Sequence, residues 1–108
     1  MPLYLGRFSY TTDSVKAMIS NPQDRGKAAA EAAESIGAKL LGFWWALGEF
    51  DGVFLLEAPD NVTAGALSML VGGSGALSKL ETTVLLTMEE AQAALGKAAG
   101  AAYRPPAG

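Results

Sequence analysis

The sequence predicts an α+β fold of the ferredoxin-like type, in which a four-stranded antiparallel sheet carries two helices on one face. The chain has the length of one domain, and half of its 108 residues are hydrophobic. Its apolar patterns switch between strand and helix spacing in the order βαββαβ, with an extra helix at the C-terminal end. Each crossover contains a helix, so both helices should cover the same sheet face. We expect a single domain over residues 1–100 and an extended, proline-containing tail over 101–108.

The first half of the chain predicts one strand followed by two helices. Residues 3–10 alternate and carry three aromatic side chains, as is typical of a strand. Residues 11–14 offer N-cap chemistry for a short helix. A second helix is expected with Asn21 as its N-cap and Pro22 at the first helical position, and with Gly37 as a left-handed C-terminal cap. The apolar stripe of this second helix consists of Ala29, Ala32, Ala33 and Ile36.

The second half predicts a hairpin, a helix, a strand and a last helix. The first strand of the hairpin is expected at 39–47 and the second at 53–58. The turn between them is expected at 48–52, because Asp-Gly favours a tight turn. Asp60 can cap a helix that runs to residue 71, and a strand follows over 79–86. Thr87 and Glu90 have the spacing of a capping box, which opens a helix that ends near Ala99.

The strand over 39–47 is apolar on both of its faces. Leu40, Gly42, Trp44 and Ala46 point one way, and Leu41, Phe43, Trp45 and Leu47 point the other way. Helices can cover only one of these faces, so the other face needs a partner surface. We expect it to pack on a second subunit, which makes the protein a homodimer or a higher homo-oligomer. The alternative is that these bulky residues pack under the terminal helix or the tail.

A hairpin register that pairs Trp45 with Leu55 and Phe43 with Glu57 places both aromatic residues on the same face as Arg7. Glu57 and Glu81, on the neighbouring strands, then lie on this same face and can flank Arg7. A slip of one residue in the register would put Trp44 on this face in place of Trp45. This group can bind a small polar ligand, or it can be an ion pair that only fixes strand register or subunit contact. The candidate ligand-binding or interface residues are Arg7, Phe43, Trp44, Trp45, Glu57 and Glu81.

The composition excludes several classes of function. The chain has no cysteine and no histidine, which removes disulfides, thiolate sites, the commonest metal ligand and the commonest general base. We therefore expect no metal and no cofactor. With 8 Lys+Arg and a net charge of −3, the chain lacks the basic stripe that binds nucleic acid. Its apolar stretches are too short to span a bilayer and no signal-peptide pattern is present, so we expect no membrane partner and a cytoplasmic location.

Seven motifs together resemble the GYD-domain family, and the likeness runs over nearly the whole chain. They are Pro2-Leu3-Tyr4-Leu5, Arg7-Phe8-Ser9-Tyr10-Thr11, Asn21-Pro22-Gln23-Asp24-Arg25, Lys39-Leu40-Leu41-Gly42-Phe43-Trp44, Gly48-Glu49-Phe50-Asp51, Glu57-Ala58-Pro59-Asp60 and Glu81-Thr82-Thr83. In the Gly-x-Tyr-Asp-type signature of the family, Phe50 stands here in place of the tyrosine. The resemblance implies a ferredoxin-like fold akin to dimeric α+β barrels, but it implies no defined activity. Kindred barrel enzymes that use a histidine, including haem-binding types, are excluded by the composition.

Two functions remain open at this point. The first is a non-catalytic binding or assembly module that uses its sheet face and holds a partner or a small-molecule ligand. The second is a cofactor-free α+β barrel enzyme of isomerase or oxygenase type, which would use Arg7 and a carboxylate on a small aromatic or polyketide-like substrate. The first is favoured, because only Arg7, Glu57 and Glu81 offer acid/base chemistry. A cavity that touches these three residues would favour a ligand or a substrate.

Overall fold

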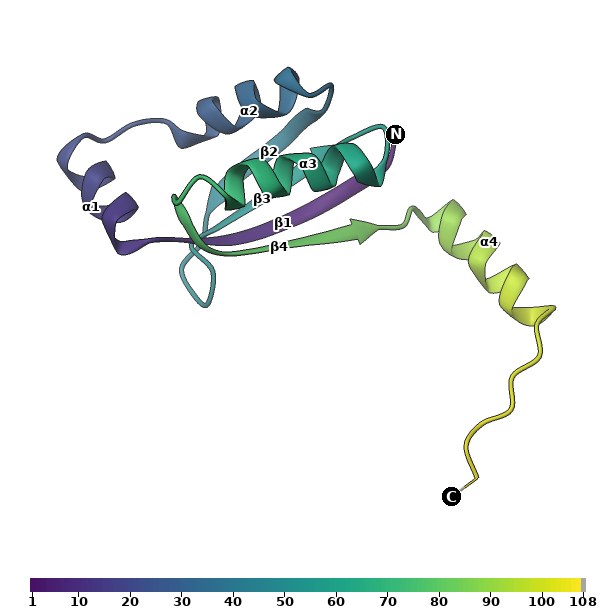
Figure 1. Ribbon diagram of the computed structural model, residues 1–108. Coiled ribbons are helices and arrows are strands. Elements are labelled where there is room, and N and C mark those ends of the chain that lie inside the picture. The colour runs from purple at the N-terminus through teal and green to yellow at the C-terminus, as the bar shows by residue number, and fades with distance from the viewer. Residues whose placement is uncertain (108) are drawn as a thin grey trace.

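The computed structural model describes residues 1–107, so Gly108, the last residue of the expected tail, lies outside the described residues. The elements are, in order, β1 (Leu3–Tyr10), α1 (Thr12–Ser20), α2 (Arg25–Ser35), β2 (Lys39–Trp45), β3 (Gly52–Glu57), α3 (Asn61–Gly72), β4 (Leu77–Leu85) and α4 (Met88–Ala99). The four strands form one antiparallel sheet in the order β2-β3-β1-β4. This arrangement confirms the expected α+β fold, with β1 and β3 as neighbours (Figure 1).

Helices α2 and α3 lie on the same face of the sheet, α2 against β2 and α3 against β4 (Figure 1). The core forms between these layers. Tyr4 and Leu56 are its largest fully buried side chains. Ala33 and Ala64 bring α2 and α3 close to the strands, because a methyl group is all that separates the helix backbone from the core there. The Tyr4 hydroxyl donates a hydrogen bond to Asn61 Oδ1 at 2.7 Å, which satisfies the polar end of a buried ring.

Most of the expected helix caps are present. The side chains of Thr11, Asp60 and Thr87 each accept a hydrogen bond from a backbone N–H in the first turn of the following helix, and Thr87 forms the capping box with Glu90. Hydrogen bonds from Thr63 hold the pKa of Asp60 below its ordinary value. Gly37 has a φ of +82°, as expected for a left-handed C-terminal cap.

The expected start of α2 at Asn21 and Pro22 is wrong. The backbone N–H of Asn21 still donates to the carbonyl of Ala17, so Asn21 ends α1 instead of opening the next helix. The N-cap of α2 is Asp24, whose Oδ1 accepts from the backbone N–H of Lys27 at 3.2 Å. The helix therefore begins at Arg25, which places this cation at one end of the layer between helix and sheet.

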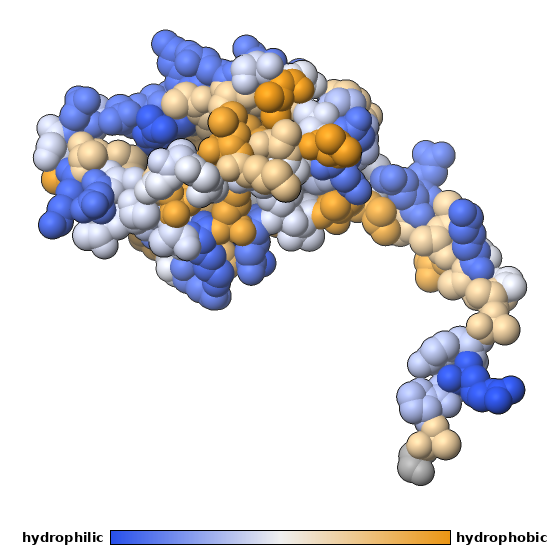
Figure 2. Space-filling model, viewed as in Figure 1, coloured by the Kyte–Doolittle hydropathy of each residue, from blue (hydrophilic) through white to orange (hydrophobic). Residues whose placement is uncertain are grey.

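Helix α4 leads away from the rest of the molecule, and residues 101–107 continue beyond it without regular secondary structure (Figure 1). Its apolar residues Met88 and Leu95 are exposed, and Figure 2 shows apolar and charged side chains side by side along this arm. None of the helices within residues 1–107 has the length and apolarity required to cross a bilayer.

The hairpin is present, but its register differs from the expected one. Trp45 lies opposite Gly52 instead of Leu55, an offset of three residues, and Phe43 lies opposite Phe54. The hairpin closes early, since the backbone N–H of Ala46 donates to the carbonyl of Asp51 at 2.8 Å. An odd offset exchanges the two faces of a strand. Phe43 and Trp45 therefore lie on the helix-bearing face, and Trp44 lies on the opposite face.

Candidate functional site

The sheet face opposite α2 and α3, here called the outer face, is apolar on the side of β2 and β3. Trp44 is 55% exposed, and its indole lies over Gly42, where a Cβ atom would collide with the ring. No helix within residues 1–107 covers this face, and α4 leads away from the sheet instead of packing on β2 as the alternative interpretation required (Figure 1). The register places these side chains on the outer face: Leu3, Leu5, Arg7, Trp44, Val53, Leu55, Glu57, Lys79, Glu81, Thr83 and Leu85.

The other side of the outer face is charged. Arg7 Nη2 donates to Glu81 Oε2 at 2.9 Å, and both side chains are 44% exposed. Glu57 lies opposite Leu3 and Lys39, near the far end of β3, whereas Arg7 lies opposite Val53. The expected pairing of Arg7 with Glu57 is therefore wrong. The two residues share a face of the sheet, but they are separated along the strand direction, since Glu57 lies opposite Leu3. An exposed pair such as Arg7–Glu81 contributes only about 0–1 kcal/mol.

The loop between β2 and β3 is fastened across one end of the outer face. Glu49 Oε1 lies 3.2 Å from Lys79 Nζ, and Asp51 Oδ2 accepts from the backbone N–H of Tyr10 at 2.9 Å. The Phe50 ring is buried, with the charged groups of Arg7 and Lys79 each 4.7 Å from its centroid. The segment with the Gly-x-Tyr-Asp pattern thus holds the hairpin loop against β1 and β4. Phe50 does this through its ring alone, without a hydroxyl group.

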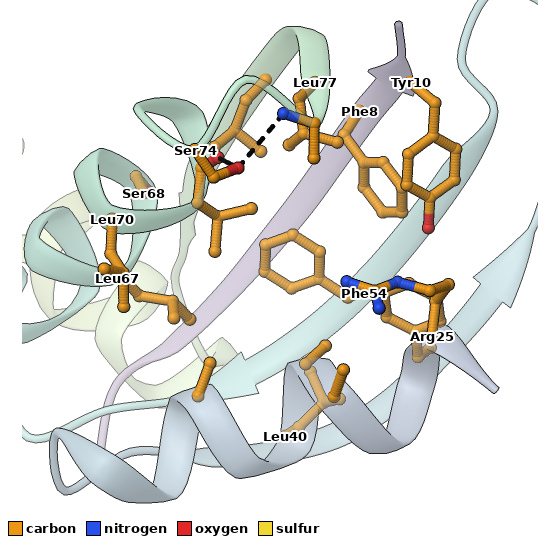
Figure 3. A pocket seen from close by; sticks show the side chains of 17 residues that line it. Phe8, Tyr10, Arg25, Leu40, Phe54, Leu67, Ser68, Leu70, Ser74 and Leu77 are labelled. Atoms are coloured by element: carbon orange, nitrogen blue, oxygen red, sulfur yellow. Dashed lines mark hydrogen bonds between the residues drawn. The ribbon is translucent and has the colours of Figure 1, made fainter. Parts of the chain in front are cut away.

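A cavity of about 250 Å³ lies on the helix-bearing face, between the sheet and helices α2 and α3 (Figure 3). Phe8, Phe43 and Phe54 form its floor. Of the candidate residues from the sequence, only Phe43 lines it. Neither this cavity nor the open groove between α3 and β4 is lined by Arg7, Glu57 or Glu81. The helix layer contributes Ala28, Ala29 and Ala32 from α2 and Leu67, Ser68, Leu70 and Val71 from α3.

Tyr10 and Arg25 lie at one end of this cavity, and sequence reasoning missed both of them (Figure 3). The Tyr10 ring packs against Trp45, with 5.3 Å between the ring centroids. Burial raises the pKa of Tyr10 above its ordinary value of 10.0; the positive charge and hydrogen bond of Arg25 oppose this shift, and Asp51 adds to it. The sequence did contain one signal for this cavity, the alanine stripe of α2. These small side chains leave space between the helix and the phenylalanine rings of the sheet.

The raised pKa of Tyr10 predicts a loss of stability at high pH. Below about pH 10 the phenol is neutral in both the folded and the unfolded chain, so the full contribution of Tyr10 to the free energy of unfolding is present. As the pH rises through the folded-state pKa, the unfolded chain releases this proton more readily, and the contribution is lost. Urea unfolding over a pH series should show a shallower alkaline decline for Tyr10→Phe than for the wild type. Tyr103→Phe, on the exposed C-terminal segment, should follow the wild type, and equal declines for all three proteins would contradict the account.

No metal site is evident in residues 1–107, where no three acidic side chains gather closely enough to hold an ion. Two groups of polar side chains are candidate sites, the Arg7–Glu81 pair on the outer face and Tyr10 with Arg25 at the cavity.

Three solved structures are similar to this chain in fold. The crystal structure of FFRP-DM1 superposes with a TM-score of 0.52 at 8% sequence identity, covering 80% of this chain and 100% of that chain. An uncharacterized NIPSNAP domain protein from Burkholderia xenovorans has a TM-score of 0.48 at 18% identity, covering 81% of this chain and 94% of its own. An uncharacterized NIPSNAP-like domain protein from the same organism has a TM-score of 0.49 at 13% identity, covering 81% and 84%.

A sequence comparison with curated proteins finds no match. The family model described as GYD domain matches residues 4–95, a range that contains all of the sheet except Leu3, together with α1 to α3 and most of α4. With this match over most of its length, the chain belongs to the GYD domain family.

Proposed function

We propose that this protein is a non-catalytic assembly and binding module that pairs the outer face of its sheet with the outer face of a second copy. The observation that carries the proposal is the exposure of Trp44 on a regular sheet surface that has no helix over it. Large exposed aromatic side chains on such a surface are typical of interfaces, where they become binding hot spots. Leu5, Val53 and Leu55 lie beside Trp44 and extend the apolar area.

A second copy suits this face because the face contains both halves of a complementary contact. One side is apolar, around Trp44 and Leu55, and the other carries Arg7 and Lys79 together with Glu81. Under twofold symmetry each patch meets a symmetry-related patch, so charges of both signs can pair across the interface while the apolar areas stack. The modest net charge of −3 does not oppose self-association.

The alternative function, a cofactor-free barrel enzyme that uses Arg7 and a carboxylate, has less support. Such chemistry needs a pocket in which the ionisable groups are shielded from water. Arg7 and Glu81 are instead half-exposed on an open face, and Glu57 lies away from them. The geometry is better suited to recognition between surfaces than to proton transfer.

The two adjacent tryptophans provide a matched test. Trp44 and Trp45 are 55% and 58% exposed, but they lie on opposite faces of the sheet. Trp44→Asp places a carboxylate in the centre of the proposed interface, so we expect light scattering to give the mass of one chain. Trp45→Asp puts the same charge beside Tyr10 on the helix side, so we expect it to retain the mass of the wild type.

Circular dichroism should show that both variants stay folded, because both tryptophans are exposed in the single chain. A Trp44→Asp protein that keeps the wild-type oligomer would contradict the proposed interface. Loss of the oligomer in Trp45→Asp alone would place the interface on the helix-bearing side instead.

A further inference from the structure

We propose that the cavity between the sheet and helices α2 and α3 binds a small aromatic carboxylate, with its ring over Phe8, Phe43 and Phe54 and its anionic group at Arg25. This site lies within one chain and on the face opposite the proposed interface. It therefore does not depend on self-association.

The size of the cavity selects a single ring. A dry apolar cavity of roughly 150 Å³ in a protein interior holds benzene. The present cavity is about 250 Å³, which leaves room for one ring and a short polar substituent. Phe8 lies 5.4 Å from Phe43 and 6.1 Å from Phe54 between ring centroids, at tilted angles. Three such rings offer faces and edges against which a fourth ring can pack.

The polar groups of the cavity are unevenly distributed. The Ser68 hydroxyl is occupied by Ala64 O and Thr82 Oγ1, and the Ser74 hydroxyl donates to Val71 O at 2.6 Å. The donors that remain for a ligand are the Arg25 guanidinium and the Tyr10 hydroxyl, which lie at the same end (Figure 3). A ligand with one apolar end and one acceptor end matches this distribution.

An anion is favoured over a neutral acceptor because of the state of Arg25. This side chain is half-buried, and its Nη1 donates to the amide oxygen of Gln23 at 2.9 Å. No carboxylate of residues 1–107 lies within ion-pair distance of it. A guanidinium beside apolar surface gains most from a carboxylate, which accepts two of its N–H groups at once. The Tyr10 phenol is protonated at neutral pH, as its ordinary pKa of 10.0 already ensures, and can donate to the same group.

Titration calorimetry with benzoate, and with benzamide as its neutral analogue, tests the assignment. We expect the wild type to bind benzoate more tightly than benzamide. Arg25→Gln should weaken benzoate binding by roughly tenfold to a hundredfold, the effect of losing a charge-assisted hydrogen bond, and should leave benzamide binding unchanged. Lys27→Gln is the matched control, since it removes the same charge from an exposed position of the same helix.

Filling the cavity gives a second, independent test. Ala29→Leu adds three carbon atoms to a residue that lines the cavity, so we expect it to abolish the binding of benzoate and benzamide alike. Trp44→Asp should bind benzoate as the wild type does, whatever its oligomeric state. The assignment is overturned if the wild type does not bind benzoate at millimolar concentration. It is also overturned if Arg25→Gln and Lys27→Gln weaken benzoate equally, or if Ala29→Leu binds like the wild type.

Discussion

Replacing Tyr4 with alanine should lower the free energy of unfolding by about 3–5 kcal/mol, the range for truncating a buried aromatic residue. Tyr4 is 1% exposed and lies in β1, one of the two inner strands of the sheet, where it packs in the same core as Ala33 and Leu56. The substitution removes the largest side chain of this core and also leaves Asn61 without its hydrogen-bond donor. Urea unfolding at one fixed protein concentration measures the effect, because self-association shifts apparent stability.

Two variants separate the contributions. Tyr4→Phe removes only the hydroxyl and should cost about 0.5–1.5 kcal/mol, the net value of one hydrogen bond. Leu95→Ala truncates a side chain that is 69% exposed on α4, and we expect a change below about 0.5 kcal/mol. If Tyr4→Ala cost no more than Leu95→Ala, the core would not lie where the structure places it.

The second large effect is expected at Gly6, where a methyl group should lower the free energy of unfolding by about 1–3 kcal/mol. Gly6 lies opposite Phe54 in the neighbouring strand, and a Cβ atom at Gly6 would collide with the Phe54 ring. The ring can avoid the collision only by leaving its position in the core and on the floor of the cavity. Urea unfolding of Gly6→Ala measures this cost.

A second-site variant and a control test the cause. Gly6→Ala should cost clearly less in a Phe54→Leu background, because the smaller side chain vacates the space that the methyl group needs. Gly65 lies inside α3, and no atom outside its own helix turn lies within 4 Å of the place that a methyl group would take there. Gly65→Ala should therefore stabilise the protein by about 0.4–1 kcal/mol. Destabilisation by both substitutions, with no relief from Phe54→Leu, would rule out the proposed collision.

Much of the fold could be predicted because its signals are local and agree with one another. The order of apolar patterns determines the strand neighbours, and Asp60 and Thr87 mark helix starts by their own hydrogen bonds. The start of α2 could not be predicted in this way. Asn21 followed by Pro22 and Asp24 followed by Arg25 are both acceptable helix openings, and the continuation of α1 to Ser20 decides between them.

The face of each tryptophan could not be predicted because residues 40–47 are apolar in both parities. Hydrophobic alternation normally determines register, and here it is missing. The register depends instead on where the loop closes and on an irregularity between Leu40 and Gly42, neither of which has a clear sequence signal. The cavity escaped prediction for a related reason. It is bounded by side chains from several strands and two helices, so it exists only once these elements are packed.

The central claim is that the outer face is covered by a second copy of the chain, and light scattering on the wild-type protein tests it most directly. At tens of micromolar, we predict a mass of at least twice the chain mass of 11.1 kDa, which falls towards the mass of a single chain on dilution or on introduction of Trp44→Asp. A wild-type mass of 11.1 kDa throughout that concentration range would contradict the account.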